Sequence, residues 1–554
     1  MAGGMGGALI NRNALATTPS AVLNWYLFFC AAVIATSGGA HGYNSSNVSL
    51  ILKMHDFKES FNLASYSKGA YADLSGWVTS IIVLGGLIGA LISAPLNDYL
   101  GRRMTLYLTS VIYVVGCIIQ IITTSSIKQV IGARAMQGFA GGLSTVTGTM
   151  FLSEIAPRAI RGLLGALFST NIMLGVALGY WSCYGSILNI SDNSHWQWRV
   201  PILVQFIPGI TIMLFLPFVI ESPRWYAMKG KNEKGLNALV RLRRLPAEHD
   251  FVLTEWSDIV NGIEAEKRTS SATWLSLAKE LKNDKTLLRR FAVAMIAQLA
   301  FNFSGNYVSY SLLRGNSITY YQGSILSQIG VEGNNAYLFS GVYGLIKVLS
   351  VFIYALFFAE QFGRRKMVLI GGTGNILCVT WIAIYLGALN GNKAGGWVSV
   401  AAICLFAVFY GIGWAPNAFG LNAEVFPNRL RAKFVSLGIT LQYLANFLLV
   451  KYFPVMTNNI TPKGPFIIFA VVSTALVIYM FFALPEVKGV GIEHMDALFS
   501  GPWYTNGIRS SILNRREREK EAENEASVHD PKASGSAEYI EQVEAKKEEG
   551  KIVV

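Results

Sequence analysis

Two basic residues lie inside long apolar stretches of the sequence, where charged side chains are rare. Arg134 lies within IGARAMQGF, and Lys347 lies within SGVYGLIKVLS. A charged side chain among hydrocarbon is costly unless it faces a protein interior and finds a partner. Arg134 therefore needs acceptor groups nearby, and the ammonium of Lys347 could bind a carboxylate or donate to hydroxyl oxygens.

Lys347 would share one helix face with Ser340, Gly341 and Gly344. Small residues of this kind gather where membrane helices pack together, so the face points inward. Lys347 is thus a candidate anchor for a bound substrate. The alternative is a lysine that is neutralised by a nearby polar network or extends outward to the membrane surface.

His41 lies near the end of the first apolar stretch, one turn before Asn44. Imidazole titrates near neutral pH, so His41 is a candidate proton carrier. A lone histidine at the end of an apolar stretch is more often structural.

Charges of opposite sign flank several apolar stretches, and their pattern occurs twice. LNDYLGRRMTL is echoed by FAEQFGRRKMVL, and FLSEIAPRAIRG is echoed by LNAEVFPNRLRA. Ion pairs across these helix ends would form a latch that closes in one conformation and opens in another. Its candidate members are Asp98, Arg102, Arg103, Glu154, Arg161, Glu360, Arg364, Arg365, Glu424 and Arg431. Exposed pairs contribute about 0–1 kcal/mol each, but shielded pairs can bias a two-state equilibrium. Alternatively, the arginines only set the orientation in the membrane.

Motifs for catalysis or metal binding are missing from the sequence. It has no Walker loop, no HExxH and no G-x-S-x-G, and its six histidines are scattered. The five cysteines fall in apolar segments without paired spacing. We therefore expect no enzyme activity, no cofactor and no bound metal.

The elements that must position these residues are membrane helices. Of 554 residues, 52% are hydrophobic and 14% are charged, whereas soluble proteins have roughly 25% charged residues. Stretches of about 20 apolar residues recur, which is the length that crosses roughly 30 Å of hydrocarbon. An all-α membrane protein is predicted, with twelve spans near 23–48, 74–96, 104–123, 127–151, 162–185, 199–220, 290–321, 337–359, 367–388, 397–423, 434–455 and 463–485.

The duplicated loops predict two six-helix halves with a site between them. Residues 23–220 form the first bundle and residues 290–485 the second. Residues 221–289 form a central cytoplasmic loop with short amphipathic helices. Residues 1–22 are a cytoplasmic N-terminal segment, and 486–554 are a cytoplasmic tail, largely disordered because it is highly charged and poor in apolar residues.

The net charge of +13 has a topological origin. Its basic residues gather in alternate short loops, which places those loops and both termini in the cytoplasm and gives no reason to expect a nucleic-acid partner. The sequons at Asn189 and Asn459 fall on the opposite side, where glycans are added.

Seven motifs in order resemble those of fungal sugar porters in the major facilitator superfamily. They are D-x-x-GRR at Asp98–Arg103, R-x-x-x-G at Arg134–Gly138, E-I-A-P-R-x-x-RG at Glu154–Gly162, ESPRW at Glu221–Trp225, GRR at Gly363–Arg365, E-V-F-P-x-R-x-R at Glu424–Arg431 and PEVKG at Pro485–Gly489. The resemblance implies the twelve-helix major facilitator fold of two pseudo-repeats. It also implies a secondary transporter that moves a sugar or sugar-like polyhydroxylated molecule by alternating access.

The substrate site implied by this resemblance consists of Gln298, Asn302, Lys347, Phe419, Gln442 and Asn446. It departs from the usual hexose site. Phe301 and Asn302 stand where hexose porters carry two glutamines, Ser169 replaces a fifth-span glutamine, and Phe419 replaces a tenth-span tryptophan. An ordinary glucose site is therefore in doubt, whereas the Lys347 pattern resembles that of fungal sugar and quinate porters.

Proton coupling is also altered relative to the family. Proton-coupled members pair the arginine at position 134 with an aspartate, but Asn44 occupies that position here. We therefore expect facilitated transport, unless His41 replaces the missing carboxylate. Tyr307–Gly315 reads as a nine-residue insert, either a genuine duplication with a bulge or non-coding sequence retained in the translation.

Further readings of the function remain open. The substrate could be an anionic sugar-like acid such as quinate or a uronate, the chain could export a fungal metabolite, or it could be a nutrient sensor that does not transport. Sensors often have longer tails than this one. The expected partners are a small polar substrate and the lipid bilayer, and we expect a monomer in the plasma membrane.

Overall fold

The computed structural model describes most of the chain between residues 18 and 507. The described ranges are 18–269, 274–303, 334–354, 362–389, 392–426, 428–459, 464–486, 498–499 and 501–507. Regular structure in these ranges is entirely helical, without a β-strand. The insert at Tyr307–Gly315, Glu360 and most of the two terminal segments lie outside the described residues.

The first half contains six membrane-length segments. The helices are α2 (Trp25–Ser46), α5 (Lys68–Leu100), α6 (Arg102–Ile122), α7 (Ile127–Ile155), α8 (Arg161–Asn189), and the continuous run of α9 (Trp196–Val204), α10 (Phe206–Phe215) and η4 (Leu216–Phe218). Short helices connect α2 to α5, and they are α3 (Val48–Ile51), α4 (His55–Ser60) and η2 (Leu63–Ser65). η1 (Ser20–Val22) precedes α2, and η3 (Arg158–Ile160) precedes α8.

The second half repeats this plan. Its helices are α15 (Lys285–Phe301), α17 (Asn334–Ile353), α18 (Arg364–Ala388), α19 (Lys393–Glu424), α20 (Asn428–Asn459) and α21 (Gly464–Ala483). Four helices lie between the halves, namely α11 (Pro223–Met228), α12 (Asn232–Arg243), α13 (Asp250–Thr269) and α14 (Trp274–Asn283). The predicted spans 290–321 and 337–359 are described only in their first parts.

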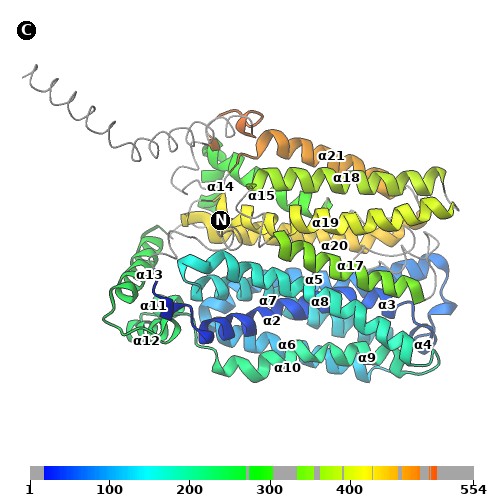
Figure 1. Ribbon diagram of the computed structural model, residues 1–554, viewed down its shortest axis with the longest axis horizontal. Coiled ribbons are helices and arrows are strands. Elements are labelled where there is room, and N and C mark those ends of the chain that lie inside the picture. Colours follow the sequence, from blue (N-terminus) through cyan, green and yellow to red (C-terminus); the bar gives the residue numbers. More distant parts are fainter. Residues whose placement is uncertain are drawn as a thin grey trace, which may run out of the picture.

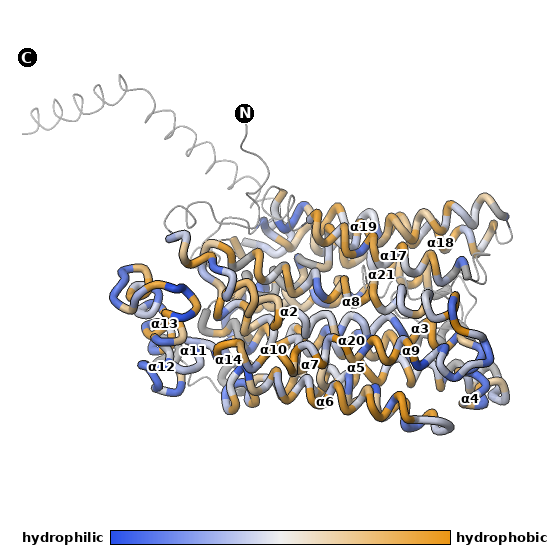
Figure 2. The backbone as a smooth tube through the Cα atoms, turned by 60° about the horizontal axis from the view of Figure 1, so that its bottom comes forward, coloured by the Kyte–Doolittle hydropathy of each residue, from blue (hydrophilic) through white to orange (hydrophobic). Residues whose placement is uncertain are grey.

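The long helices lie side by side along the long axis of the molecule (Figure 1). Helices α11–α13 lie at one end, which we call the basic end, and α3 and α4 lie at the opposite end. Hydrophobic positions follow the long helices, and hydrophilic positions gather at the two ends (Figure 2). Among the described helices, nine are long and apolar enough to cross a membrane.

Helix α7 is long enough to cross a membrane and contains several glycines. It packs against α2, α5, α6 and α8. A Cβ added at Gly138 would lie 2.1 Å from the backbone oxygen of Ile82, and one added at Gly142 would lie 2.0 Å from that of Gly86. Only glycine permits such a close approach of two helix backbones. Glycine therefore fixes the distance between α5 and α7.

Among the described helices, the halves pack together mainly through α5 with α20 and α8 with α17. The ring of Tyr443 packs on Gly86, because a Cβ there would lie 2.7 Å from the ring. Trp181 packs on Gly341 in the same way, at 2.9 Å. These contacts place the middle of α20 and the first half of α17 directly against the first bundle.

Candidate functional site

At the basic end of the first half, Arg102 is buried in a network of acceptors. Its Nε lies 3.0 Å from Glu154 Oε2, and its Nη2 lies 2.9 Å from Glu154 Oε1. Asp98 lies farther away, with 3.7 Å between its Oδ1 and Arg102 Nη1. A paired guanidinium and carboxylate with this two-pronged geometry form a strong, directional contact. Three of the predicted latch residues are thus in contact.

Glu221 caps the start of α6 and was not among the predicted latch residues. Its carboxylate accepts from the backbone nitrogens of Arg102 and Arg103, each at 3.0 Å. The N-cap is Gly101 with φ of +92°, and a Cβ there would lie 2.5 Å from Glu221 Oε2. Burial raises the pKa of Glu221, while the bonds from Ser222, Arg103 and Arg102 oppose the rise. The Arg103 guanidinium instead donates to the backbone oxygen of Val219 at 3.2 Å.

The second half has an equivalent cap. Gly363 has φ of +79°, and Glu486 Oε1 accepts from the backbone nitrogen of Arg364 at 2.9 Å. The Arg364 guanidinium donates through Nη1 to the Tyr354 hydroxyl at 3.1 Å. Arg365 donates to the backbone oxygen of Phe481 at 2.7 Å. Glu221 and Glu486 each follow the last span of a half within two residues of a proline, and this repeated signal could have identified both.

Other predicted latch members remain predictions. Glu360 lies outside the described residues, and the side chains of Arg161, Glu424 and Arg431 are also outside the description, although their backbones belong to α8, α19 and α20. The same holds for the side chains of Phe419 and Asn459.

Arg134 lies fully buried between α2 and α5. Its Nη1 donates to Asn44 Oδ1 at 3.2 Å, its Nη2 to the Asn44 backbone oxygen at 3.4 Å, and its Nε to the Val78 backbone oxygen at 2.7 Å. These three acceptors are neutral oxygens. Asn44 Nδ2 donates in turn to Gln137 Oε1 at 3.0 Å. The two coupling candidates Arg134 and Asn44 are therefore direct partners.

His41 lies elsewhere, at the joint between the halves. Its ring centre is 6.4 Å from that of Tyr443, edge to face. The Tyr443 hydroxyl donates to Thr145 Oγ1 at 3.3 Å. Among the described residues, His41 Nδ1 has no hydrogen-bond partner. The third coupling candidate thus faces α20 rather than Arg134.

Three buried amides of the second half lie near one another, Gln298 on α15, Asn302 directly after α15 and Gln442 on α20. Gln298 Nε2 donates to the Ala418 backbone oxygen at 2.9 Å, and Asn302 Nδ2 donates to the Gln442 backbone oxygen at 3.0 Å. The side-chain oxygens of Gln298, Asn302 and Gln442 have no hydrogen-bond partner within the described ranges. Buried amide oxygens are normally satisfied, so these three are candidates to accept from a ligand.

Lys347 and Asn446 are also buried in the second half. The Lys347 ammonium lies 5.2 Å from the centre of the Tyr343 ring and 4.8 Å from that of Tyr410. Aromatic faces stabilise a desolvated cation. Lys347 therefore does not extend outward to the membrane surface.

At the opposite end, an ion pair joins the halves and was not predicted. Lys451 of α20 pairs with the carboxylate of Asp73 on α5, and its Nζ lies 3.4 Å from the Asp73 backbone oxygen. The same ammonium lies 4.3 Å from the centre of the Trp77 ring. Asn189, a glycan candidate, is exposed at this end of α8.

Comparison with known proteins places this arrangement in a family. The family model described as "Sugar (and other) transporter" matches residues 30–499. A probable quinate permease of Aspergillus flavus is 29% identical over 494 residues, covering 87% of this chain and 90% of that protein. The quinate permease of Emericella nidulans is 28% identical over 543 residues, covering 95% and 98%.

Solved structures show the same fold. A proton:xylose symporter bound to 6-bromo-6-deoxy-D-glucose superposes with a TM-score of 0.70 at 20% identity, covering 86% of this chain and 99% of that chain. A partially occluded, inward-open xylose transporter from E. coli gives 0.69, also at 20% identity, covering 84% and 100%. The predicted all-α fold of twelve spans is confirmed. The chain has the fold of the major facilitator superfamily, belongs to the sugar (and other) transporter family and is a secondary transporter of sugar-like compounds.

Proposed function

We propose that the substrate binds at the three buried amides Gln298, Asn302 and Gln442. The observation that carries this proposal is their unpartnered oxygens. A buried polar atom without a partner costs about 1–3 kcal/mol. Hydroxyl groups of a polyhydroxylated substrate would donate to these oxygens and remove that cost. Asn446 and Phe419 belong to the same proposed site through their positions on α20 and α19.

A carboxylate-bearing substrate is the second candidate, and Lys347 favours it. A cation that is 1% exposed inside a membrane bundle attracts an anion strongly, because little water screens it. The relatives named quinate permeases agree with this candidate. The sugar analogue in the solved neighbour is neutral and agrees with the first.

Alternating access would be controlled at both ends of the molecule. At the basic end, Arg102, Glu154 and the other predicted latch residues would hold the helix ends in one state. At the opposite end, Asp73 and Lys451 belong to different halves and must separate if the halves part there. We propose that transport runs downhill, since Asn44, which accepts from Arg134 Nη1, cannot bind or release a proton.

We further propose a monomer in the plasma membrane, with the basic end and both termini in the cytoplasm and no enzymatic activity. The basic loops support this orientation. Asn189 then lies on the extracellular side, where a glycan can be attached. Lipid surrounds the exposed apolar side chains of the long helices.

Uptake assays in a host that lacks its own hexose and quinate transporters test the proposal. Asn302→Ala and Gln442→Ala should raise KM at normal surface expression, by about tenfold for each lost hydrogen bond to a substrate hydroxyl. Gln129→Ala, which removes an exposed amide at the start of α7, is the matched control. Lys347→Met should abolish uptake of quinate while sparing neutral sugars if the substrate is an acid.

Three results would count against these assignments. Unchanged affinity in both amide variants would refute the site. Unchanged quinate uptake in Lys347→Met would refute the acid anchor. Absence of uptake for hexoses, pentoses, disaccharides, uronates and quinate at normal surface expression would favour a sensor.

A further inference from the structure

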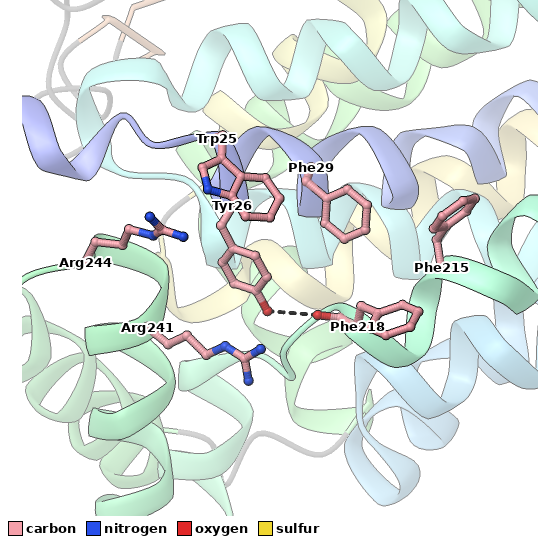
Figure 3. Close-up of a pocket in the computed structure, with 7 residues that line it drawn as sticks. All are labelled: Trp25, Tyr26, Phe29, Phe215, Phe218, Arg241 and Arg244. Atoms are coloured by element: carbon pink, nitrogen blue, oxygen red, sulfur yellow. Dashed lines mark hydrogen bonds between the residues drawn. The ribbon is translucent and has the colours of Figure 1, made fainter.

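A pocket at the basic end of the first half has an aromatic wall (Figure 3). Its volume is about 410 Å³. Trp25, Tyr26 and Phe29 come from the first turns of α2, and Phe215 and Phe218 come from the end of α10 and from η4. Two apolar spans thus meet the polar segment between the halves at this pocket. That is the depth at which aromatic side chains contact lipid headgroups.

Arg241 of α12 and Arg244, the C-cap residue of that helix, complete the lining of the pocket. The guanidinium carbon of Arg241 lies 5.1 Å from the centre of the Tyr26 ring, and that of Arg244 lies 5.5 Å from the centre of the Trp25 ring. Both side chains are exposed, and neither forms an ion pair with a carboxylate in the described part of the chain. Arg243 between them differs, because it is buried and donates to both oxygens of Glu255. The pocket therefore keeps two positive charges.

The walls of the pocket are fixed to one another. The Tyr26 hydroxyl donates to the Phe218 backbone oxygen at 2.9 Å and so joins α2 to η4. Asn24 Nδ2 donates to the Leu242 backbone oxygen at 2.9 Å and joins α2 to α12. The pocket is a built feature of the fold rather than a gap between independent segments.

Arg244 occupies an unusual backbone position for its residue type. It ends α12 with φ of +53°, in the left-handed region where glycine or asparagine is usual. The backbone nitrogen of Arg244 still donates to the Val240 oxygen at 2.8 Å. This conformation brings its side chain to the Trp25 ring.

We propose that this pocket binds an anionic glycerophospholipid from the leaflet at the basic end. The phosphate would lie between Arg241 and Arg244, because guanidinium groups match phosphate oxygens with two parallel hydrogen bonds. The first part of an acyl chain would lie along Phe29, Phe215 and Phe218. A soluble anion would gain nothing from these rings, and Phe218 is 65% exposed at the end of an apolar span. This site is separate from the proposed substrate site.

The test uses the full chain in nanodiscs of phosphatidylcholine that contain a photoactivatable phosphatidylserine. Mass spectrometry should find the probe on peptides that contain residues 25–29 or 215–218. Arg241→Gln/Arg244→Gln should reduce this labelling by about tenfold or more, since both bidentate contacts are lost. Lys231→Gln/Lys234→Gln removes the same charge from exposed positions at the start of α12 and should leave the labelling unchanged.

Two further variants keep the test decisive if the double glutamine variant folds poorly. Arg241→Lys/Arg244→Lys keeps the charge but loses the planar fork, and its labelling should fall between wild type and the glutamine variant. Phe215→Ala should weaken labelling through the apolar wall alone.

Three outcomes would overturn the proposal. They are equal labelling by photoactivatable phosphatidylcholine, labelling that is unaffected by both arginine variants, and displacement of the lipid by millimolar inorganic phosphate. The last outcome would indicate a site for a soluble anion.

Discussion

A single amide determines what Arg134 can do. An arginine stays charged at every physiological pH, so any proton that moves near it must be carried by a partner. The side-chain oxygen of Asn44 accepts a hydrogen bond from Arg134 Nη1, but the amide cannot bind or release a proton. Because the amide is also held by Gln137, the site is arranged for structure rather than for titration.

Asn44→Asp should introduce proton coupling. The new carboxylate would lie within hydrogen-bond reach of Arg134, and its proton affinity would depend on that contact. Gln137 would have to turn its amide, because an ionised aspartate cannot donate to Oε1. We expect substrate-dependent inward current at acidic external pH in the variant and none in the wild type.

A clear substrate-dependent proton current in the unmodified protein would contradict downhill transport. His41→Ala then identifies the carrier, since loss of the current in that variant would assign it to His41.

Glu221 should make stability depend on pH in an unusual direction. Burial raises its folded-state pKa above the unfolded value, so the folded state binds more protons between the two values. The contribution of Glu221 to stability is therefore largest at low pH and falls as pH rises through the folded pKa. Relative to Glu221→Gln, the wild type should lose thermal stability over that interval.

Glu221→Ala separates charge from capping. It leaves the backbone nitrogens of Arg102 and Arg103 without their acceptor, which should cost about 1–3 kcal/mol at every pH. Thermal unfolding in detergent at several pH values measures both effects. A pH-independent difference between wild type and the glutamine variant would show that burial does not control this carboxyl.

Some of the charged contacts near helix ends were predicted from the sequence, and others were missed. Arg102 and Glu154 were identified because both lie beside apolar stretches in a repeated motif. Glu221 was missed because it accepts from backbone nitrogens, and a search for opposite charges does not find such contacts. Lys451 and Asp73 were missed because 378 positions separate them in the chain.

At the scale of elements, the packing of α7 against its neighbours depends on the small size of its residues more than on their hydrophobicity. Burial on several sides lets it carry glycine and hydroxyl residues that a lipid-facing span would avoid. Its place in the chain and its approximate length were predicted from the sequence, as a span near 127–151. The approach of its backbone to α5 was not, since glycines in membrane helices occur in many settings.

Gly138→Ala should prevent close packing of α5 and α7. The added methyl group would meet the backbone of Ile82, which cannot move without shifting the helix. Overpacking of this kind costs about 1–3 kcal/mol and sometimes more. We expect less folded protein and a lower melting temperature in detergent.

Gly132→Ala provides the control on the same helix. No heavy atom within the described structure lies within 4 Å of a Cβ at that position. Higher helix propensity should then leave stability unchanged or raise it by up to about 1 kcal/mol. Equal effects of the two substitutions would show that the interhelical distance is not fixed by glycine.

At the scale of the whole molecule, contacts between the halves determine which state is seen. Tyr443, Trp181 and Lys451 each bridge the two bundles, and Lys451 does so at the end opposite α11–α13. The twelve-helix plan and the duplication were predicted from motifs and hydrophobic stretches. Which residues of the two bundles touch each other depends on the conformational state of the transporter. The pattern of apolar residues in the sequence does not contain that information. The predicted domain boundaries stay predictions.

Asp73→Lys should favour the state that is open at the opposite end. Asp73 is largely exposed, so losing the pair is worth about 1 kcal/mol, which changes the ratio of two states by about fivefold. Repulsion between two lysines adds to this effect. The swap Asp73→Lys/Lys451→Asp should restore wild-type behaviour. Labelling rates of a cysteine introduced at the half-buried Phe447 of α20, which faces α5 next to Trp77, measure the opening in each background.

An equal labelling rate in all three backgrounds would exclude the pair from gating. A swap that behaves like the single variant would show that the surroundings of each residue, such as the Trp77 ring beside Lys451, matter more than the pairing.

The cap formed by Glu221 has a consequence for biosynthesis. Arg102, Glu154 and Glu221 all precede residue 222, so the cap of α6 and the Arg102–Glu154 pair are complete once the chain has been made as far as the residue after the sixth span. Domains form as units and those nearest the N-terminus form first during synthesis. The start of α6 can therefore be capped while the ribosome is still translating the second bundle. The helices of the first bundle can pack together before the second bundle enters the membrane.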